Sequence, residues 1–250
     1  MNDERSDAVI GTAFPEIGAG GYTRADGSVE FYSRVRSLLE PRMKVLDFGA
    51  GRAHWFEDDK CAYRRSVRQI RGKVAEVVAC DVDEAVMKNR AVDRAVLIEA
   101  EDQLPFPDRY FDLIVADYVF EHVRDSHLVS RELTRVLATG GWICARTPNA
   151  YGYATLMSRL IANRFHVRLL GLAQPSRKAV DIFPTVYRLN TLRAVRRHFD
   201  AASFDNFTYR YDAEPAYFFD SEFVFRALRA LQWLLPPQCA SQLFIFLRKR

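Results

Sequence analysis

Apolar and helical segments alternate along the first 149 residues of the chain. Short apolar runs with strand character lie near 43–48, 75–80, 94–98, 111–117 and 141–147. Helical patterns separate several of them, near 52–71, 83–90 and 125–138. Strands that alternate with helices in this way are typical of parallel sheets covered on both faces. The pattern predicts an α/β fold with a Rossmann-like, doubly wound and mostly parallel sheet.

Both ends of the chain depart from this alternation. Residues 1–20 show little periodicity, which predicts a mobile arm. A helix capped by Ser28 should follow over 28–40 and stop at Pro41. After residue 149 a basic, partly apolar stretch precedes a helix that Asn190-Thr191 should cap. The remaining predicted elements are that helix at 191–199, strands at 204–211 and 242–247, the last antiparallel, and a helix at 219–234.

A buried strand that opens into a glycine turn is the most specific local signal. The run from Lys44 to Gly51 ends its strand at Asp47 and continues as Gly49-Ala50-Gly51. Glycines let a ligand approach the backbone, and the N–H groups of a following helix would face that ligand. A carboxylate here would repel a pyrophosphate but can bind an ammonium group and tolerates a sulfonium cation. His54 replaces the third glycine of the dinucleotide-binding pattern.

Further motifs follow in a fixed order. Asp81 ends a second apolar strand, where an acid typically holds ribose hydroxyls. Then come Leu104-Pro105-Phe106-Pro107-Asp108, the strand that ends at Asp117, Glu121-His122-Val123, Glu132 to Leu137, and Gly140-Gly141. Over residues 42–149 the chain resembles the class I S-adenosylmethionine-dependent methyltransferases, especially the group that includes quinone-biosynthesis methyltransferases. The motif set is specific for the cofactor but gives almost no information about the acceptor.

The resemblance assigns residues to the cofactor S-adenosylmethionine. It implies that the glycine turn holds the methionine moiety and that Asp81 holds the ribose. Family members usually carry an acid four residues before Leu-Pro-Phe, where this chain has Ala100, so Glu101 and Asp102 are the nearest substitutes for an adenine contact. The predicted cofactor-binding residues are Asp47, Gly49, Ala50, Gly51, Asp81, Val82, Glu101, Asp102 and Asp117.

A catalytic edge is predicted after the fourth strand. Asp117 ends that strand, and Glu121-His122 should open the next helix above the sulfonium. Histidine titrates near neutral pH, so His122 could take a proton from a hydroxyl or amine acceptor. Alternatively, Glu121 and His122 only cap and orient the helix. Some quinone-pathway relatives use an acid–histidine pair with a metal ion, but Tyr118 replaces the second acid here, and no metal is predicted.

Two aromatic segments have a functional and a plain structural interpretation. Tyr22, Arg24, Phe31 and Tyr32 could cover the cofactor, although aromatic residues at helical spacing more often belong to a core. The helix at 219–234 has a broad apolar face with two arginines, which suits packing on the sheet or contact with a membrane surface.

Composition is that of one globular domain. The 250 residues are 49% apolar and 27% charged, and the four cysteines are widely spaced, as in a protein with reduced thiols. The polar N-terminus has no signal-peptide core, so a cytoplasmic location is expected. Residues 151–250 hold 15 basic and 7 acidic residues, a balance of +8. This bias indicates either a solvated surface or a face that contacts an anionic acceptor or a membrane surface.

The predicted function is methyl transfer from S-adenosylmethionine to a small-molecule, lipid-linked or glycan-linked acceptor. O-methylation is favoured because the Asn/Asp-Pro-Pro-aromatic motif of many N-methylating enzymes is absent. Alternatives are a nucleic-acid methyltransferase, which the scattered basic residues make unlikely, and a regulatory module that binds the cofactor without turnover. We expect an N-terminal arm and helix at 1–41, a cofactor core at 42–149 and an acceptor part at 150–250. An apolar stripe with arginines at 156–170 would be an acceptor lid, a membrane patch or plain packing.

Overall fold

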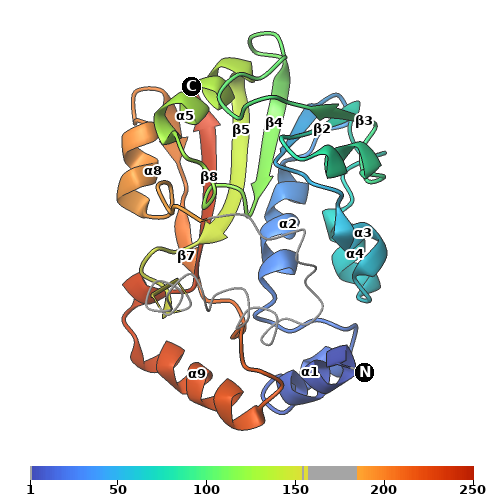
Figure 1. Cartoon of the computed structure of the whole chain (residues 1–250), viewed down its shortest axis with the longest axis vertical. Helices are drawn as coiled ribbons and strands as arrows, with labels where there is room; N and C mark the ends of the chain where they lie inside the picture. Colours follow the sequence, from blue (N-terminus) through green and yellow to red (C-terminus); the bar gives the residue numbers. More distant parts are fainter. Residues whose placement is uncertain (1, 154, 157–184) are drawn as a thin grey trace.

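One mixed sheet organises the protein. The computed structural model describes residues 2–153, 155–156 and 185–250. Within them an eight-stranded sheet has helices on both faces, while α1 and α9 lie together at one end of the molecule (Figure 1). The strands are β1 (Lys44–Phe48), β2 (Glu76–Asp81), β3 (Arg94–Leu97), β4 (Phe111–Asp117), β5 (Leu137–Pro148), β6 (Phe204–Asn206), β7 (Tyr209–Tyr211) and β8 (Gln242–Lys249).

Strand order confirms the predicted fold class. The order is β3-β2-β1-β4-β5-β8-β6, with β7 also paired to β8. The pairs among β1 to β5 are parallel, and β8 runs antiparallel to its three neighbours. The strand predicted at 204–211 is broken into β6 and β7, which share one edge of β8. The break falls at Phe207, whose N–H donates to the carbonyl of Phe246 at 2.8 Å.

The helices and 3-10 turns divide between the two faces of the sheet and its ends. Their bounds are α1 (Asn2–Gly11), η1 (Pro15–Gly18), α2 (Gly27–Leu38), α3 (His54–Asp58), α4 (Ala62–Arg68), η2 (Glu84–Lys88), α5 (Ser126–Val136), α8 (Leu192–His198), α9 (Glu222–Leu234) and η4 (Pro237–Cys239). Alternate side chains of each strand enter different cores. Leu46 of β1 joins the core that α5 and α8 cover, and Val45 joins the core beneath α2 and α4.

The prediction of one continuous helix over 52–71 is wrong. The segment is divided into α3 and α4, because the chain turns between Asp58 and Ala62. The carboxylate of Asp59 accepts a hydrogen bond from the N–H of Cys61 at 2.9 Å, and the thiol of Cys61 then caps α4. The helix expected at 83–90 is the 3-10 turn η2, which Asp83 caps.

Other predicted caps and elements differ in detail. The cap of α2 is Asp26, whose carboxylate accepts from the N–H groups of Ser28 and Val29, so Ser28 is not the cap. Thr191 caps α8 as predicted. Polar side chains that accept from the first free N–H groups stabilise each of these helix starts.

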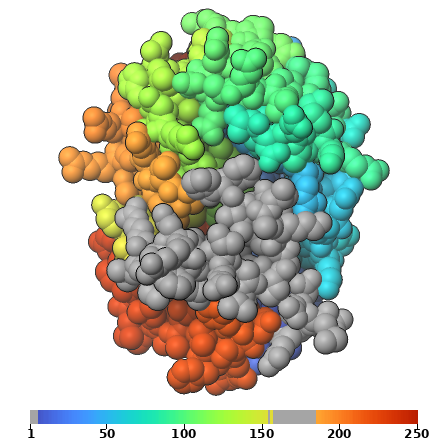
Figure 2. Space-filling model, viewed as in Figure 1, coloured from blue at the N-terminus to red at the C-terminus, as the bar shows by residue number. Residues whose placement is uncertain are grey.

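The expectation of a mobile arm at residues 1–20 is wrong. Residues 2–11 form α1 and residues 15–18 form η1. Val9 of α1 and Phe14, which directly precedes η1, are buried against Phe225 of α9, which explains why α1 and α9 lie side by side. Figure 2 shows α9 at the lower end of the molecular surface, where Trp233 is 85% exposed.

No helix in the described ranges has the length and apolar character that a membrane span requires. The stripe predicted at 156–170 lies outside the described residues, apart from its first residue.

Candidate cofactor and active site

The carboxyl ends of β1, β2, β4 and β5 lie at one edge of the sheet, in the middle of Figure 1. In open α/β sheets, ligands bind outside this edge. Asp47, Asp81 and Asp117 each occupy a strand end there, as predicted, and Arg146 of β5 pairs in register with Asp117. Three acids and an arginine are therefore brought to one edge.

The glycine turn after β1 is fixed by contacts that only glycine permits at its first position. Gly49 has a φ of +69°, and its N–H donates to the carbonyl of Cys80 at 2.8 Å. A Cβ at Gly49 would lie 2.5 Å from a methyl group of Val119. At Gly51 a Cβ would meet no described residue within 4 Å, so the described part of the chain leaves room for a ligand beside this turn.

Asp81 supports the turn and keeps acceptor capacity. One carboxylate oxygen accepts from the N–H of Gly51 at 2.8 Å, and the other accepts from the N–H of Asp83 at 3.0 Å. Each oxygen has a second lone pair for a further donor, such as a ribose hydroxyl. Asn89 also holds the turn by donating to the carbonyl of Gly51 at 3.2 Å, a role that sequence reasoning missed. Val82 follows with 43% of its surface exposed.

Asp47 is an unusual carboxylate. It is partly buried, and its side chain has no hydrogen-bond partner among the described residues. The pKa of Asp47 is raised to about 7, chiefly by burial and also by the negative charge of Asp117, against the opposing charge of Arg68. A cation that binds here would favour the ionised form. The residue is therefore suited to receive an ammonium group.

Asp117, in contrast, is fully engaged. Its two oxygens accept from the guanidinium of Arg146 at 2.7 and 2.8 Å, and one also accepts from Arg68 at 3.2 Å and from the hydroxyl of Tyr32 at 3.1 Å. Burial alone would raise its pKa, but Arg146 and Arg68 hold the pKa of Asp117 below the ordinary value. This carboxylate stays charged and anchors the cations around it.

Arg146 is a site residue that sequence reasoning missed. Only 3% of its surface is exposed, and besides Asp117 it donates to the hydroxyl of Ser28 at 2.9 Å. Its guanidinium lies 4.7 Å from the ring centre of Tyr118, which adopts a left-handed φ of +58°. The available signal was a charged residue inside an otherwise apolar strand, since a buried charge needs a partner.

Arg68 reaches the same cluster from α4. Its guanidinium lies 4.7 Å from the ring centre of Trp55 and 5.1 Å from that of Tyr32. One of its terminal nitrogens is bonded to Asp117, while its buried Nε has no hydrogen-bond partner among the described residues. An arginine with an unused N–H group can still donate to an anionic group, because guanidinium binds carboxylates through two parallel hydrogen bonds.

Two acids, Glu101 and Asp102, follow β3 in the chain. Burial raises the pKa of Glu101, and the negative charge of Asp81 raises it further. Asp102 adds a smaller effect of the same sign. Both side chains are partly buried. The charge of Asp81 therefore acts on Glu101, which indicates that the two acids lie near each other.

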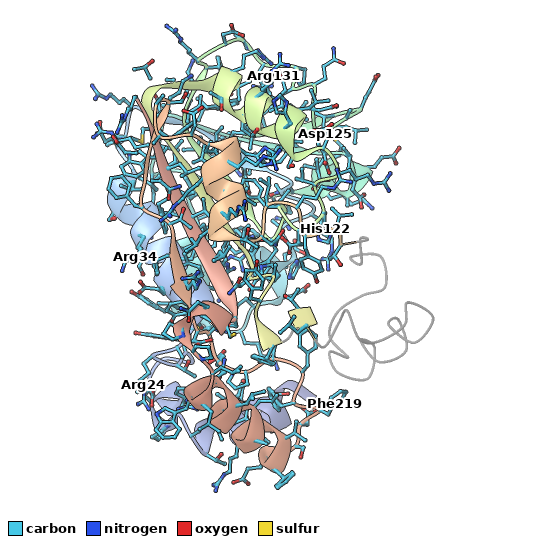
Figure 3. The ribbon with its side chains drawn as sticks, turned by 90° about the vertical axis from the view of Figure 1, so that its left-hand side faces the viewer. Arg24, Arg34, His122, Asp125, Arg131 and Phe219 are labelled. Carbon is cyan, nitrogen blue, oxygen red and sulfur yellow. The ribbon has the colours of Figure 1, made fainter. Side chains whose placement is uncertain are left out.

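Glu121 and His122 do not open a helix, which corrects the prediction. They lie in the turn 120–122, and α5 starts only at Ser126 with Asp125 as its cap. Figure 3 shows His122 well away from Asp125 and Arg131, toward the middle of the molecule. Among the described residues the cap role thus belongs to Asp125.

The two side chains of this turn have different surroundings. Glu121 is 4% exposed, and its carboxylate accepts from the hydroxyl of Thr147 at 2.8 Å. Thr147 in turn accepts from the amide of Asn190 at 2.6 Å, which ties the turn to β5 and α8. The ring of His122 is 22% exposed, with Nε2 4.0 Å from Glu121. His122 therefore has access to the surface beside a buried acid.

Only one residue of the predicted aromatic cover is bonded to the site in the described part of the chain. Tyr32 donates to Asp117, whereas Phe31 is fully buried in the core. Tyr22 stacks on Tyr63 with ring centres 4.9 Å apart, and Arg24 forms an ion pair with Glu16. The described residues hold no group of three or more potential metal ligands.

Known proteins resemble this chain in sequence and in fold. A family model described as a methyltransferase domain matches residues 46–145. The ubiquinone/menaquinone biosynthesis C-methyltransferase of Shewanella sp. strain ANA-3 is 31% identical over 155 residues. That alignment covers 56% of this chain and 58% of the relative, so the chain spans less than two thirds of that protein.

Solved structures add the fold. An S-adenosylmethionine-dependent methyltransferase from Archaeoglobus fulgidus superposes with a TM-score of 0.53 at 16% identity, over 90% of this chain and 95% of the other. The 4+2 cyclase SpnF superposes with the same TM-score of 0.53 at 14% identity, over 90% and 83%. The fold therefore does not by itself fix the reaction. Residues 46–145 are nevertheless similar to methyltransferase domains, and this similarity indicates S-adenosylmethionine as the cofactor.

Proposed function

We propose that the protein transfers a methyl group from S-adenosylmethionine to a small-molecule acceptor. One observation carries the proposal. Asp47 has no hydrogen-bond partner in the described part of the chain, and Arg68, whose charge acts on Asp47, has an unpartnered Nε. An unpaired carboxylate and a guanidinium with a spare donor match the ammonium and carboxylate groups of an amino-acid zwitterion. The methionine end of the cofactor has these two groups.

The remaining residues fit the nucleoside end. Asp81 offers free lone pairs to ribose hydroxyls, and the exposed side chain of Val82 offers an apolar surface to adenine. Glu101 and Asp102 would contact the adenine amino group from the loop after β3. Gly49 and Gly51, with Ala50 between them, let the ligand lie against the backbone.

The bound cofactor supplies a methyl group on a positively charged sulfur, and the protein supplies position and electrostatics. The acceptor atom would take this methyl group as the carbon–sulfur bond breaks, and the sulfur would become a neutral thioether. Asp47 and Asp117 place negative charge near the cation. His122 would accept the proton that a hydroxyl acceptor loses, and the buried Glu121 beside it would favour the protonated imidazole.

The acceptor atom has two candidates. The position of His122 favours oxygen, because a hydroxyl must lose its proton to complete the transfer. The Shewanella relative is a C-methyltransferase, and this similarity favours carbon. We propose O-methylation and treat C-methylation as the outcome that would replace it.

Calorimetry tests the cofactor site. Asp47→Asn and Asp81→Ala should each weaken S-adenosylmethionine binding by about 10- to 150-fold, because each removes a charge-assisted contact of roughly 1.5–3 kcal/mol. Arg68→Met should weaken binding by a similar factor. Glu57→Gln on α3 is the matched control, since Glu57 is exposed and forms only a surface ion pair with Arg90. Affinities unchanged in all three site variants would refute the assignment.

A transfer assay tests the reaction. Purified protein is incubated with methyl-labelled cofactor and metabolite extracts, and the labelled product is identified by mass spectrometry. His122→Ala should lower turnover by about 10²–10⁴ with cofactor affinity intact. Label on a ring carbon would replace O-methylation with C-methylation. Tight cofactor binding without any labelled product would favour the non-catalytic binding module.

A further inference from the structure

A cavity lies at the edge of the sheet opposite the carboxyl ends of the parallel strands. It has a volume of about 500 Å³ and is lined by α5, the end of α8, the turn before β4 and the last residues of β8. We call it the α5–α8 basin and define it by Arg109, His127, Arg131, Arg197, His198 and Lys249. Figure 3 shows α5, which carries Arg131, above the neighbouring α8. From Phe111 to Asp117 the strand β4 spans about 20 Å, so the basin is remote from the cofactor edge.

Three guanidinium groups of the basin are unpaired. The side chains of Arg109, Arg131 and Arg197 have neither a hydrogen bond nor an ion pair with any other described residue. They come from three separate elements, the turn before β4, α5 and α8. Most of the other arginines in the cofactor half, such as Arg64 and Arg146, are paired with acids. Cations that converge on one cavity without partners indicate a site for an anion.

Two further cations hold the walls of the basin. Arg135 pairs with Asp108 and Glu132, both at 2.8 Å, and also donates to two carbonyls. Lys249 donates to the carbonyls of Thr134 and Leu137, each at 2.7 Å. These contacts tie α5, β5, β8 and the turn before β4 together. The unpaired cations therefore lie on elements that these hydrogen bonds and ion pairs hold in place.

The acids of the basin do not neutralise it. Asp108 is engaged with Arg135, and Asp200 accepts from the N–H groups of Ala202 and Ser203. Burial lowers the pKa of His198, and Arg197 and His127 lower it further against the opposing charge of Asp125. Burial likewise lowers the pKa of Lys249, with Arg109 adding to the effect. For both groups burial is the larger cause, and neighbouring cations add to it against one opposing acid each, Asp125 for His198 and Asp108 for Lys249.

We propose that the α5–α8 basin binds a small phosphate-bearing anion, independently of the cofactor. Planar guanidinium groups pair with phosphate oxygens through two parallel hydrogen bonds, and imidazoles add donors when protonated. The volume exceeds the needs of a single small ion and falls within the range of roughly 300–1,000 Å³ for organic ligands. A diphosphate or a phosphorylated metabolite has the charge and the size that the basin accommodates.

The first test is calorimetric titration of the full chain with inorganic pyrophosphate. We expect one site per chain. Arg131→Glu with Arg197→Glu should weaken binding at least about tenfold, since it removes two charge-assisted contacts and adds repulsion. Arg193→Glu with Arg196→Glu is the matched control, because these exposed arginines of α8 do not line the basin. The control should bind within about twofold of the wild type, since exposed charges remote from a ligand contribute little.

A second measurement locates the ligand. The imidazole signal of His198, identified by NMR with a His198→Gln variant, should titrate at higher pH when pyrophosphate is bound. The pKa of His198 rises because a nearby anion favours the protonated ring. Affinity for S-adenosylmethionine should be unchanged in the Arg131→Glu/Arg197→Glu variant, which separates this proposal from the proposed function.

Three results would overturn the proposal. One is no saturable pyrophosphate binding at low salt, and another is an equal loss in the control variant, which would indicate net charge alone. The third is binding of single-stranded RNA or anionic vesicles, but not of pyrophosphate, with the same dependence on Arg131 and Arg197. That result would assign the basin to a larger polyanion.

Discussion

The two edges of the sheet handle charge in opposite ways. At the carboxyl edge, Arg146 is buried and its donors are matched to Asp117 and Ser28. At the amino edge, Arg131 is exposed and unpaired within the described structure. At the carboxyl edge the protein's own ion pairs fix the charges before a ligand binds, and Asp47 is left to pair with a cation of the ligand. The amino edge leaves the protein's own cations for an incoming anion to satisfy.

The difference shows how burial sets the role of a charged residue. A buried ion pair loses the hydration of both ions, so it must be complete and is costly to break. An exposed cation remains hydrated and costs little when it has no partner. Substitutions of the buried charges at the carboxyl edge should therefore affect folding and cofactor binding together, whereas substitutions of the unpaired cations at the amino edge should affect only a ligand.

The largest expected effect concerns Arg146. Arg146→Met should lower the free energy of unfolding by about 3–5 kcal/mol, because it leaves the charge of Asp117 buried with weaker partners. Urea unfolding monitored by circular dichroism measures the change. Arg131→Met, the matched substitution at the other edge, should stay within about 0.5 kcal/mol of the wild type. Adding Asp117→Asn to Arg146→Met should recover part of the loss, and equal effects at both edges would contradict the comparison.

A somewhat smaller effect is expected at Gly49. Gly49→Ala should cost about 2–4 kcal/mol, because the new methyl group is forced against Val119 and the residue must keep a positive φ. The double variant Gly49→Ala/Val119→Ala should recover the packing part and leave the backbone strain. Gly140, which has a φ of +80° and open space around its Cβ direction, provides the control at the amino edge. Gly140→Ala should cost only about 1–2 kcal/mol, and thermal unfolding distinguishes the two glycines.

The smallest effect concerns the pH dependence of Asp47. With a pKa near 7 against an ordinary value of 3.8, the folded protein binds an extra proton between about pH 4 and pH 7. Stability of the free protein should therefore fall by on the order of 1–2 kcal/mol as pH rises through this window, with allowance for partial solvation. Asp47→Asn should remove most of this slope in denaturant titrations.

The same carboxyl should make cofactor affinity rise with pH. Only the ionised form of Asp47 pairs with an ammonium group, so affinity at pH 5.5 should be roughly thirtyfold weaker than near pH 7.5. Above about pH 8 it should fall again, as the α-amino group of the cofactor loses its proton. Calorimetry across this range is the measurement. A flat profile would show that Asp47 does not contact the ammonium group.

Local sequence determined much of the fold and of the cofactor edge. The apolar runs placed β1, β2 and β4 to within a residue or two, because buried parallel strands have few alternatives to continuous apolar sequence. Asp47 and Asp81 stood out because each ends such a run. Helix continuity was less readable, since the division between α3 and α4 depends on the local bonds of Asp59 and Cys61.

Tertiary structure decided the pairings between distant residues. The bond from Tyr32 to Asp117 joins positions 85 apart, and the Arg146–Asp117 pair joins two strands through their register. The α5–α8 basin likewise collects cations from positions 109, 131 and 197. Such sets have no signature in the sequence, because hydrophobic periodicity specifies which side chains are buried and not which of them meet. By itself the sequence specified the sheet, the glycine turn and the cofactor; the packing of helices on that sheet decided which charges are paired and which stay free.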